Sequence, residues 1–255
     1  NCYCSILYCW HFIFNFNFDL MKSIFQFKQF QVNQGNCAMK INTDGVLLGG
    51  LIESFNAQRI LDIGTGTGVI AMMLAQKFSS SKIYGVEIDV AASEQASLNF
   101  AGSVFNDRLE VIASSFQELK PEQPYDLIVS NPPFYTNSLH NPDPRRSLAK
   151  HTDPKFFRDL IDFVDRNLSS SGKFYCVLPT LIAQYIIEEL LPKSSLLFQG
   201  VTNISSFHGE LAIRKVIQLG KKESLFEEKH FSIYATKGVY TDEYKEILKP
   251  YFLNF

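Results

Sequence analysis

A short apolar strand that runs into a glycine-rich turn and then into an apolar helix constrains this chain most. The segment reads RILDIGTGTGVI and continues as AMMLAQ over residues 59–76. Closely spaced glycines let the backbone turn sharply and bring amide N–H groups close to a ligand. Units of strand, turn and helix assemble into parallel sheets covered by helices. The segment therefore predicts an α/β fold with a ligand at its turn.

The same alternation of apolar and helical patterns continues along the chain. Strands are predicted near 59–63, 82–87, 109–113, 125–130, 172–178, 213–219 and 230–235. Helices are predicted near 44–56, 68–78, 90–101, 154–168 and 180–191. Together they indicate a mostly parallel, seven-stranded sheet with helices on both faces. The last two strands flank the charged stretch 221–229, so we expect them to form a C-terminal antiparallel hairpin with a long solvated loop.

Composition sets limits on the class of protein. With 255 residues, of which 46% are hydrophobic, the chain can bury one complete core. A formal charge of -2 excludes a globally basic nucleic-acid binder, so any contact with RNA has to come from a local patch. The five cysteines show neither a CxxC pair nor a zinc-like spacing with histidine. We therefore expect reduced thiols, no metal site and a cytoplasmic protein.

Residues 1–20 differ from the rest. Cysteine, phenylalanine, tyrosine and asparagine dominate, and Met21 follows directly. A secretory signal needs a basic start and a small-residue cleavage site, and residues 1–20 have neither. A membrane span needs a longer apolar run without the polar residues that interrupt this one. We interpret 1–20 as a non-native or disordered extension, with a membrane anchor as the alternative. Residues 21–255 are then a single domain, in which 21–58 precede the glycine-rich unit.

The acids near the glycine-rich turn indicate the charge of its ligand. Asp62 precedes glycines spaced Gly-x-Gly-x-Gly, whereas a dinucleotide site has Gly-x-Gly-x-x-Gly. An acid at this position repels a pyrophosphate and suits a sulfonium or an α-ammonium group. Glu87 ends the next strand, where doubly wound folds place an acceptor for ribose hydroxyls, and Asp89 is expected to cap the helix that follows. The alternative is that these carboxylates are simply solvated strand ends.

A second strand end carries the motif Asn131-Pro132-Pro133-Phe134, after the strand YDLIVS. Prolines lack an N–H, so carbonyls beside them are free to accept hydrogen bonds from a ligand. The Asn131 amide adds an acceptor and Phe134 adds a flat surface, which together suit a planar exocyclic amine such as that of adenine. An ordinary strand-ending turn is the alternative. With a sulfonium at the glycine turn, the motif favours methyl transfer to an amine.

With these motifs, the chain resembles the class I S-adenosylmethionine-dependent methyltransferases, and among them the bacterial adenine-N(6) methyltransferases of valine tRNA. The narrower resemblance rests on 27–30 (FKQF), 37–45 (CAMKINTDG) and 131–135 (NPPFY), and it runs from about Phe25 to 251–253. It implies a Rossmann-like fold, S-adenosylmethionine as the cofactor, tRNA as the partner, and a methyltransferase domain whose segment 21–58 flanks the cofactor.

The resemblance also implies roles for individual residues. Cofactor-binding residues are Lys40, Thr43, Asp44, Asp62, Gly64, Gly66, Gly68, Glu87, Ser115 and Asn131. Catalytic residues are Asn131, Pro132, Pro133 and Phe134. Apart from the resemblance, the motif and the basic loop after it predict the substrate-binding residues Phe134, Tyr135, Arg145, Arg146 and Lys150, because a flat ring stacks on a base and cationic side chains pair with phosphates. Ser115 departs from the pattern because many relatives have an acid there. Without the resemblance, 43–45 is a plain helix start. For the basic loop 135–152, the alternative to a phosphate contact is a plain solvated loop.

The expected activity is methylation of the exocyclic amine of an adenine in tRNA, at the anticodon-adjacent position of tRNA(Val). The same motif also suits a protein glutamine or an rRNA guanine methyltransferase. A glutamine methyltransferase typically has a separate N-terminal helical domain, for which the chain between Met21 and 43–45 is short. A non-enzymatic RNA-binding or cofactor-binding module is a further alternative. We expect a monomer, without a metal or a membrane.

Overall fold

The structure is a computed structural model of the chain, and it describes residues 23–35, 40–133 and 154–255. The expected extension at 1–20 lies outside the described residues.

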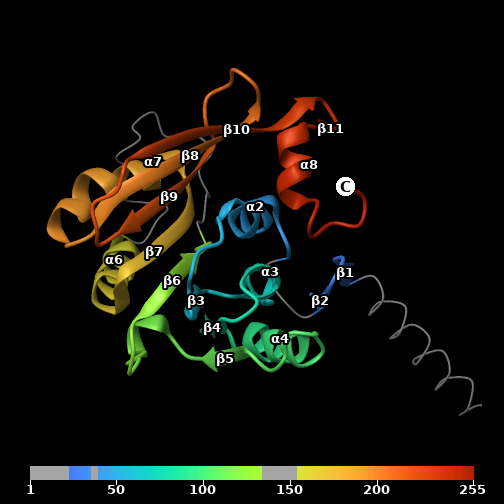
Figure 1. Cartoon of the computed structure of the whole chain (residues 1–255), viewed down its shortest axis with the longest axis horizontal. Helices are drawn as coiled ribbons and strands as arrows, with labels where there is room; N and C mark the ends of the chain where they lie inside the picture. The colour runs from blue at the N-terminus through green and yellow to red at the C-terminus, as the bar shows by residue number, and fades with distance from the viewer. Residues whose placement is uncertain (1–22, 36–39, 134–153) are drawn as a thin grey trace, which may run out of the picture.

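A nine-stranded sheet forms the centre of the molecule (Figure 1), in the order β11-β10-β8-β9-β7-β6-β3-β4-β5. The strands are β3 (Arg59–Ile63), β4 (Lys82–Glu87), β5 (Leu109–Ala113), β6 (Tyr125–Ser130), β7 (Leu168–Pro179), β8 (Leu197–Phe207), β9 (Arg214–Gly220), β10 (Glu227–Thr236) and β11 (Val239–Tyr240). All neighbours from β5 to β7 are parallel, whereas β9 is antiparallel to both β7 and β8. The predicted α/β fold with a mostly parallel sheet is confirmed.

Helices cover both faces of the sheet (Figure 1). One face carries α2 (Thr43–Leu51), α3 (Val69–Lys77), α4 (Val90–Ala101) and α8 (Asp242–Leu248). The other carries α6 (Pro154–Asn167), α7 (Thr180–Tyr185) and the short turns η1 (Phe116–Glu118), η2 (Ile186–Leu190) and η3 (Leu191–Lys193). Successive residues of a strand point to opposite faces, so Ile60 joins the first core and Leu61 the second. This double burial explains the continuous apolar runs of the central strands.

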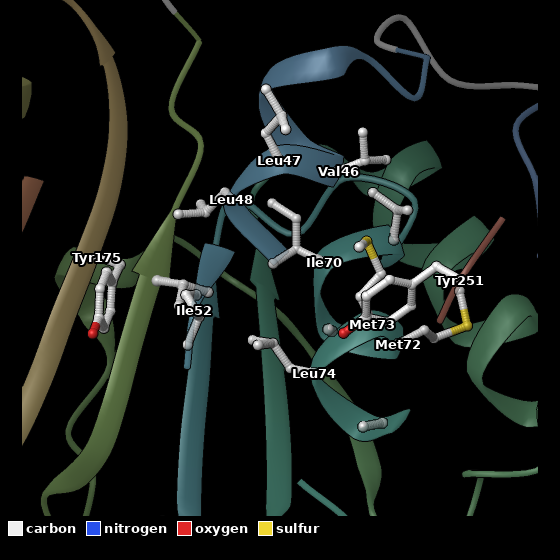
Figure 2. Packing of buried hydrophobic residues seen from close by; sticks show 14 of the residues in the cluster. Val46, Leu47, Leu48, Ile52, Ile70, Met72, Met73, Leu74, Tyr175 and Tyr251 are labelled. Atoms are coloured by element: carbon white, nitrogen blue, oxygen red, sulfur yellow. The ribbon is translucent and has the colours of Figure 1, made fainter. Parts of the chain in front are cut away.

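The helix α2 packs directly on α3 over the central strands. Figure 2 shows Leu48 of α2 and Ile70 of α3 side by side above β3, and both side chains are buried. The two helices approach closely at Gly49, where an added Cβ would stand only 3.0 Å from the sulfur of Met73. A side chain larger than that of glycine would press on Met73 and push α2 away from α3. Packing therefore sets the position of α2.

The first strands that the structure describes pack against the C-terminal residues. The strands β1 (Ile24–Gln26) and β2 (Gln31–Asn33) form a small antiparallel sheet, and Phe27 forms a β-bridge with Phe252. The ammonium of Lys28 donates to the carbonyls of Lys249 and Phe255 at 2.5 and 3.2 Å. The segment FKQF therefore docks the C-terminus onto the start of the domain.

The predicted pairing of the C-terminal hairpin is wrong. The strand at 214–220 pairs antiparallel with β8, which was not predicted, and β10 runs parallel to β8 on its other side. The strands at 213–219 and 230–235 are therefore separated by β8. The polar residues of β8 weaken its apolar signal, and they are buried because β10 satisfies them. Asn203 donates to Glu228 at 2.7 Å, and the hydroxyls of Ser205 and Ser232 lie 3.1 Å apart.

Candidate functional site

The carboxyl ends of β3 and β6 meet at the centre of the sheet. Ile63 is paired with Ser130, whose hydroxyl donates to the Ile63 carbonyl at 2.9 Å. From this pair, β4 and β5 extend in one direction and β7 in the other. Open α/β sheets bind ligands in the crevice at such a reversal of strand order. By this rule, the glycine loop after β3 and Asn131 after β6 border the crevice in which a ligand is expected.

The three glycines after β3 have different tasks. Gly64, Gly66 and Gly68 have φ values of 71°, 56° and 87°, in the left-handed region. A Cβ added at Gly64 or Gly66 would meet nothing within 4 Å, so the outer side of the loop is open to a ligand. At Gly68 a Cβ would overlap Cε1 of Phe100 in α4. The first two glycines thus leave room for a ligand, and the third serves packing.

Asp62 lies beneath this loop and is fully buried. Its Oδ2 accepts a hydrogen bond from the Thr65 hydroxyl at 2.7 Å, and its Oδ1 has no hydrogen-bond partner among the described residues. Burial raises the pKa of Asp62 to about 7, and the nearby Glu87 carboxylate adds to the rise, which Thr65 and the Ala71 amide oppose. A buried carboxyl group with a free oxygen favours a cationic ligand.

Glu87, at the end of β4, holds the glycine loop in place. Its Oε2 accepts from the Gly66 amide at 2.9 Å and its Oε1 from the Asp89 amide at 3.0 Å. Each carboxylate oxygen has a second lone pair, so Glu87 can still accept from a ribose hydroxyl. Asp89 caps α4 by accepting from the Ala92 amide at 2.8 Å, and that prediction is confirmed.

Ser115 follows β5 and caps the short turn η1. Its hydroxyl accepts from the Gln117 amide at 3.3 Å and also contacts the Gln117 side-chain oxygen. One lone pair of the hydroxyl oxygen remains for a ligand, without the charge of an acid.

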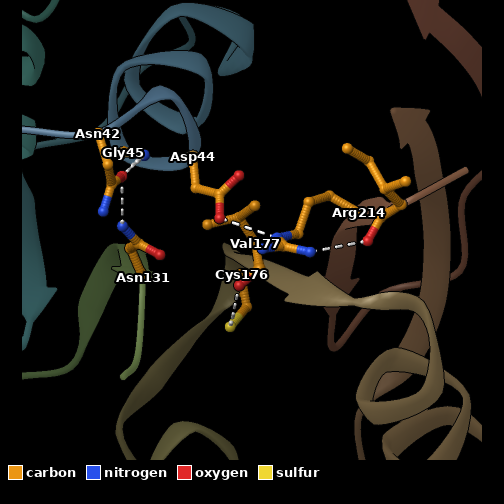
Figure 3. Close-up of polar contacts among 8 residues, drawn as sticks. Asn42, Asp44, Gly45, Asn131, Cys176, Val177 and Arg214 are labelled. Carbon is orange, nitrogen blue, oxygen red and sulfur yellow. Dashed lines mark hydrogen bonds and ion pairs between the residues drawn. The ribbon is translucent and has the colours of Figure 1, made fainter. Parts of the chain in front are cut away.

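The start of α2 lies beside the end of β6 (Figure 3). Asn42 is the N-cap of α2, and its Oδ1 accepts from the Gly45 amide at 2.9 Å and from Nδ2 of Asn131 at 3.4 Å. Asp44 Oδ2 pairs with Arg214 Nε at 2.8 Å, which ties α2 to the start of β9. Lys40 and Thr43 are exposed at the same end of the helix. The predicted segment therefore reaches the crevice, although Asp44 is engaged by Arg214.

Two of these contacts were not predicted from the sequence. Asn42 could have been recognised as an N-cap, because asparagine directly precedes the helix. Arg214 gives no such signal, because its partner Asp44 lies 170 positions away. Pro132 is buried and Pro133 is exposed. Five predicted substrate or catalytic residues lie outside the described residues, namely Phe134, Tyr135, Arg145, Arg146 and Lys150.

A groove of about 930 Å³ lies at the opposite edge of the sheet, near the amino end of β7. Its lining combines charges of both signs, and Lys229 pairs with Glu53 there at 2.8 Å. This groove is separate from the predicted site. No metal-binding group of three or more His, Cys, Asp or Glu side chains occurs within the described ranges. None of the helices described is long and apolar enough to span a membrane.

Comparison with known proteins identifies the family. The methyltransferase small domain family matches residues 39–197. A tRNA1(Val) (adenine(37)-N6)-methyltransferase of Pedobacter heparinus is 45% identical over 92% of this chain and 100% of its own length. Proteins of the same name from Aeromonas hydrophila and Bacteroides thetaiotaomicron are each 39% identical over 90% of this chain and 97% of their own length. The chain belongs to the tRNA1(Val) (adenine(37)-N6)-methyltransferase family.

Solved structures agree with this family at the level of the fold. A predicted O-methyltransferase, Atu636, from Agrobacterium tumefaciens has a TM-score of 0.62 at 19% identity, over 82% of this chain and 96% of that one. A ribosomal protein L11 methylase from Lactobacillus delbrueckii has a TM-score of 0.54 at 17% identity, over 75% of this chain and 84% of that one. The predicted class I methyltransferase fold is confirmed.

S-adenosylmethionine is the cofactor of this methyltransferase class, and the crevice fits it. The free oxygen of buried Asp62 suits a cationic group, and the space outside Gly64 and Gly66 admits a ligand close to the backbone. Glu87 faces the same loop as a hydroxyl acceptor.

Proposed function

We propose that this member of the family transfers a methyl group from S-adenosylmethionine to the exocyclic N6 amine of adenine 37 in tRNA1(Val). The relatives with this name match nearly the whole chain. The structural observation that carries the proposal is the position of Asn131 beside the glycine loop, at the point where the strand order reverses. A methyl donor and an amine held there would lie side by side.

The cofactor would be held by residues of the loop and of the neighbouring strand ends. Asp62 and the open backbone at Gly64 and Gly66 would face its methionine end, while Glu87 would accept from its ribose. Gly68 supports the loop through its packing against α4. Ser115 would accept from the adenine of the cofactor, and the remaining flanking residues are Lys40, Thr43 and Asp44.

When bound, the cofactor supplies a methyl group on a positively charged sulfur. The protein's own task is to align the amine. An adenine amine delocalises its lone pair into the ring, so acceptors that draw its hydrogens out of plane make the nitrogen more nucleophilic. We assign this role to Asn131 Oδ1 and the Pro132 carbonyl, beside Pro133. Phe134 would stack on the base.

The tRNA would be held by the loop that follows the motif. Tyr135 would contact the bases, and Arg145, Arg146 and Lys150 would contact phosphates. Binding should then weaken steeply between low and moderate salt, because phosphate contacts release counterions. A flat salt dependence would favour a protein glutamine substrate instead.

The decisive experiment supplies purified protein with labelled S-adenosylmethionine and total tRNA from a strain that lacks the enzyme. We expect N6-methyladenosine at position 37 of tRNA1(Val) and no label in other tRNAs. An absence of labelled N6-methyladenosine from this tRNA would refute the proposal, and parallel assays with rRNA and with protein substrates test the guanine and glutamine alternatives. We further propose that residues 21–255 act as one domain, as a monomer, in the cytoplasm. Light scattering of purified protein tests the oligomeric state.

A further inference from the structure

We infer that Asn42 is a positioning residue for this reaction, because it determines which way the amide of Asn131 faces. The inference rests on the proposed function, since it assigns Asn131 Oδ1 to the substrate amine.

The argument starts from a backbone donor of α2. The first amides of a helix have no partner within the helix, and the Gly45 amide donates to Asn42 Oδ1 at 2.9 Å (Figure 3). Because an N–H bonds only to an acceptor, this contact determines which side of the Asn42 amide carries its oxygen. The orientation of Asn42 therefore follows from the backbone of α2.

The orientation of the Asn42 amide determines that of the Asn131 amide. The oxygen that faces Gly45 also faces Asn131, at 3.4 Å from Nδ2. An asparagine side chain presents either its oxygen or its NH2 to a neighbour, and an oxygen can be matched only by the NH2. The contact is long, as is common for catalytic groups before the substrate complex forms. The chain of two hydrogen bonds thus turns the Asn131 oxygen away from α2.

This orientation leaves Asn131 Oδ1 available to accept a hydrogen bond from the substrate amine. Asn131 Oδ1 accepts no hydrogen bond from the described residues, and in Figure 3 it points away from Asn42. A flipped amide would direct NH2 hydrogens at the hydrogens of the substrate amine, and donors facing each other repel. Asn42 therefore favours the productive orientation before any substrate binds.

The cap itself is held firmly. The residues of α2 that follow it, Val46 to Leu48, are buried against the core. The ion pair between Asp44 Oδ2 and Arg214 Nε, at 2.8 Å, connects the same helical turn to β9. A positioning residue needs such support because a small displacement would release its partner.

Two substitutions separate positioning from helix capping. Asn42→Ser keeps an oxygen for the Gly45 amide but is too short to reach Asn131. Asn42→Asp keeps an acceptor for both contacts. In single-turnover methylation of tRNA, we expect the rate of Asn42→Ser to fall roughly tenfold or more. Its thermal stability and its KM for tRNA, measured separately, should be unchanged. Asn42→Asp should recover most of the rate. Adding Asn42→Ser to Asn131→Ala should cause no further loss.

The outcomes distinguish this inference from the proposed function. If Asn131→Ala is inactive while Asn42→Ser methylates tRNA at the wild-type rate, the positioning role is overturned and the proposed function stands. An equal loss in Asn42→Asp and Asn42→Ser also overturns it, because the acceptor would then not matter. If the wild-type protein transfers no label to tRNA adenine, the proposed function itself fails.

Discussion

Replacing either of two glycines of the cofactor loop with alanine should have different effects on stability and on cofactor affinity. Gly64 and Gly68 have similar φ values of 71° and 87°. An L-residue in this left-handed conformation costs about 1–2 kcal/mol. Because both variants bear this conformational cost, the difference between them reports what each new Cβ meets.

The structure provides the magnitudes. At Gly64 the Cβ would meet nothing within 4 Å, so the free energy of unfolding should fall only by about 1–2 kcal/mol. At Gly68 it would overlap Cε1 of Phe100 and lie 3.0 Å from its Cζ. The Phe100 ring is buried, and overpacking adds about 1–3 kcal/mol. The free energy of unfolding of Gly68→Ala should therefore be lower than that of the wild type by about 2–5 kcal/mol in total.

Urea denaturation followed by circular dichroism measures these losses, and calorimetry measures binding of S-adenosylmethionine. We expect Gly64→Ala to lose cofactor affinity out of proportion to its stability, because its Cβ occupies the space assigned to the ligand. Phe100→Leu, added to Gly68→Ala, should recover part of the lost stability. Wild-type affinity in Gly64→Ala would refute the assignment of the loop to the cofactor. Equal stability of the two single variants would refute the packing argument.

Three further outcomes follow from the site. Asn131→Ala should reduce turnover on the order of 100-fold or more, and single-turnover rates within about tenfold of wild type would contradict its alignment of the amine. Burial raises the pKa of Asp62 to about 7 from 3.8. Its contribution to stability is therefore full below pH 3.8 and is lost as the pH rises through 7, by about 4 kcal/mol in all. Urea titrations from pH 4 to 7 should show this slope in the wild type and lack it in Asp62→Asn, and equal slopes would refute it. A double-mutant cycle of Asp44→Ala with Arg214→Ala should give a coupling of about 1 kcal/mol, and additive losses would show that the pair does not stabilise the start of α2.

The parts of the fold that were predicted correctly have strong local signals. The unit from β3 to α4 combines continuous apolar strands with a glycine turn and an Asp89 cap, and all of these signals lie within a few residues of the structure that they predict. The error concerns β8, where Asn203 and Ser205 are buried although they are polar. Their partners lie on β10, so the signal that would identify this strand is a tertiary contact. Pairing in the C-terminal half therefore could not be derived from apolar periodicity alone.

The site shows the same division between local and distant contacts. Asp62, Glu87 and Asn131 were predicted because each lies within one residue of the end of a recognisable strand, and the structure brings these strand ends together at one edge. The contact that orients Asn131 is distant in sequence. Asn42 and Asn131 are separated by 89 positions. A contact of this kind depends on the packing of a helix on a sheet, which residue types alone do not specify.

The short helix α2 depends on tertiary contacts at both ends. Helices of nine residues are marginal in isolation, so α2 must be held by its surroundings. At its C-terminal end the ammonium of Lys77 donates to the carbonyls of Gly49, Gly50 and Ile52, at 3.0, 2.8 and 2.5 Å. At its start, Arg214 reaches Asp44 from β9.

Arg214 lies beyond residues 39–197, which match the methyltransferase small domain family. The helix that carries Asn42 is therefore held partly by a strand that this match does not include. If Asn42 orients Asn131, the alignment of the amine depends on β9 as well as on the motif at the end of β6. Fragments that end near residue 197 should then lose alignment of the amine even where the glycine loop is complete.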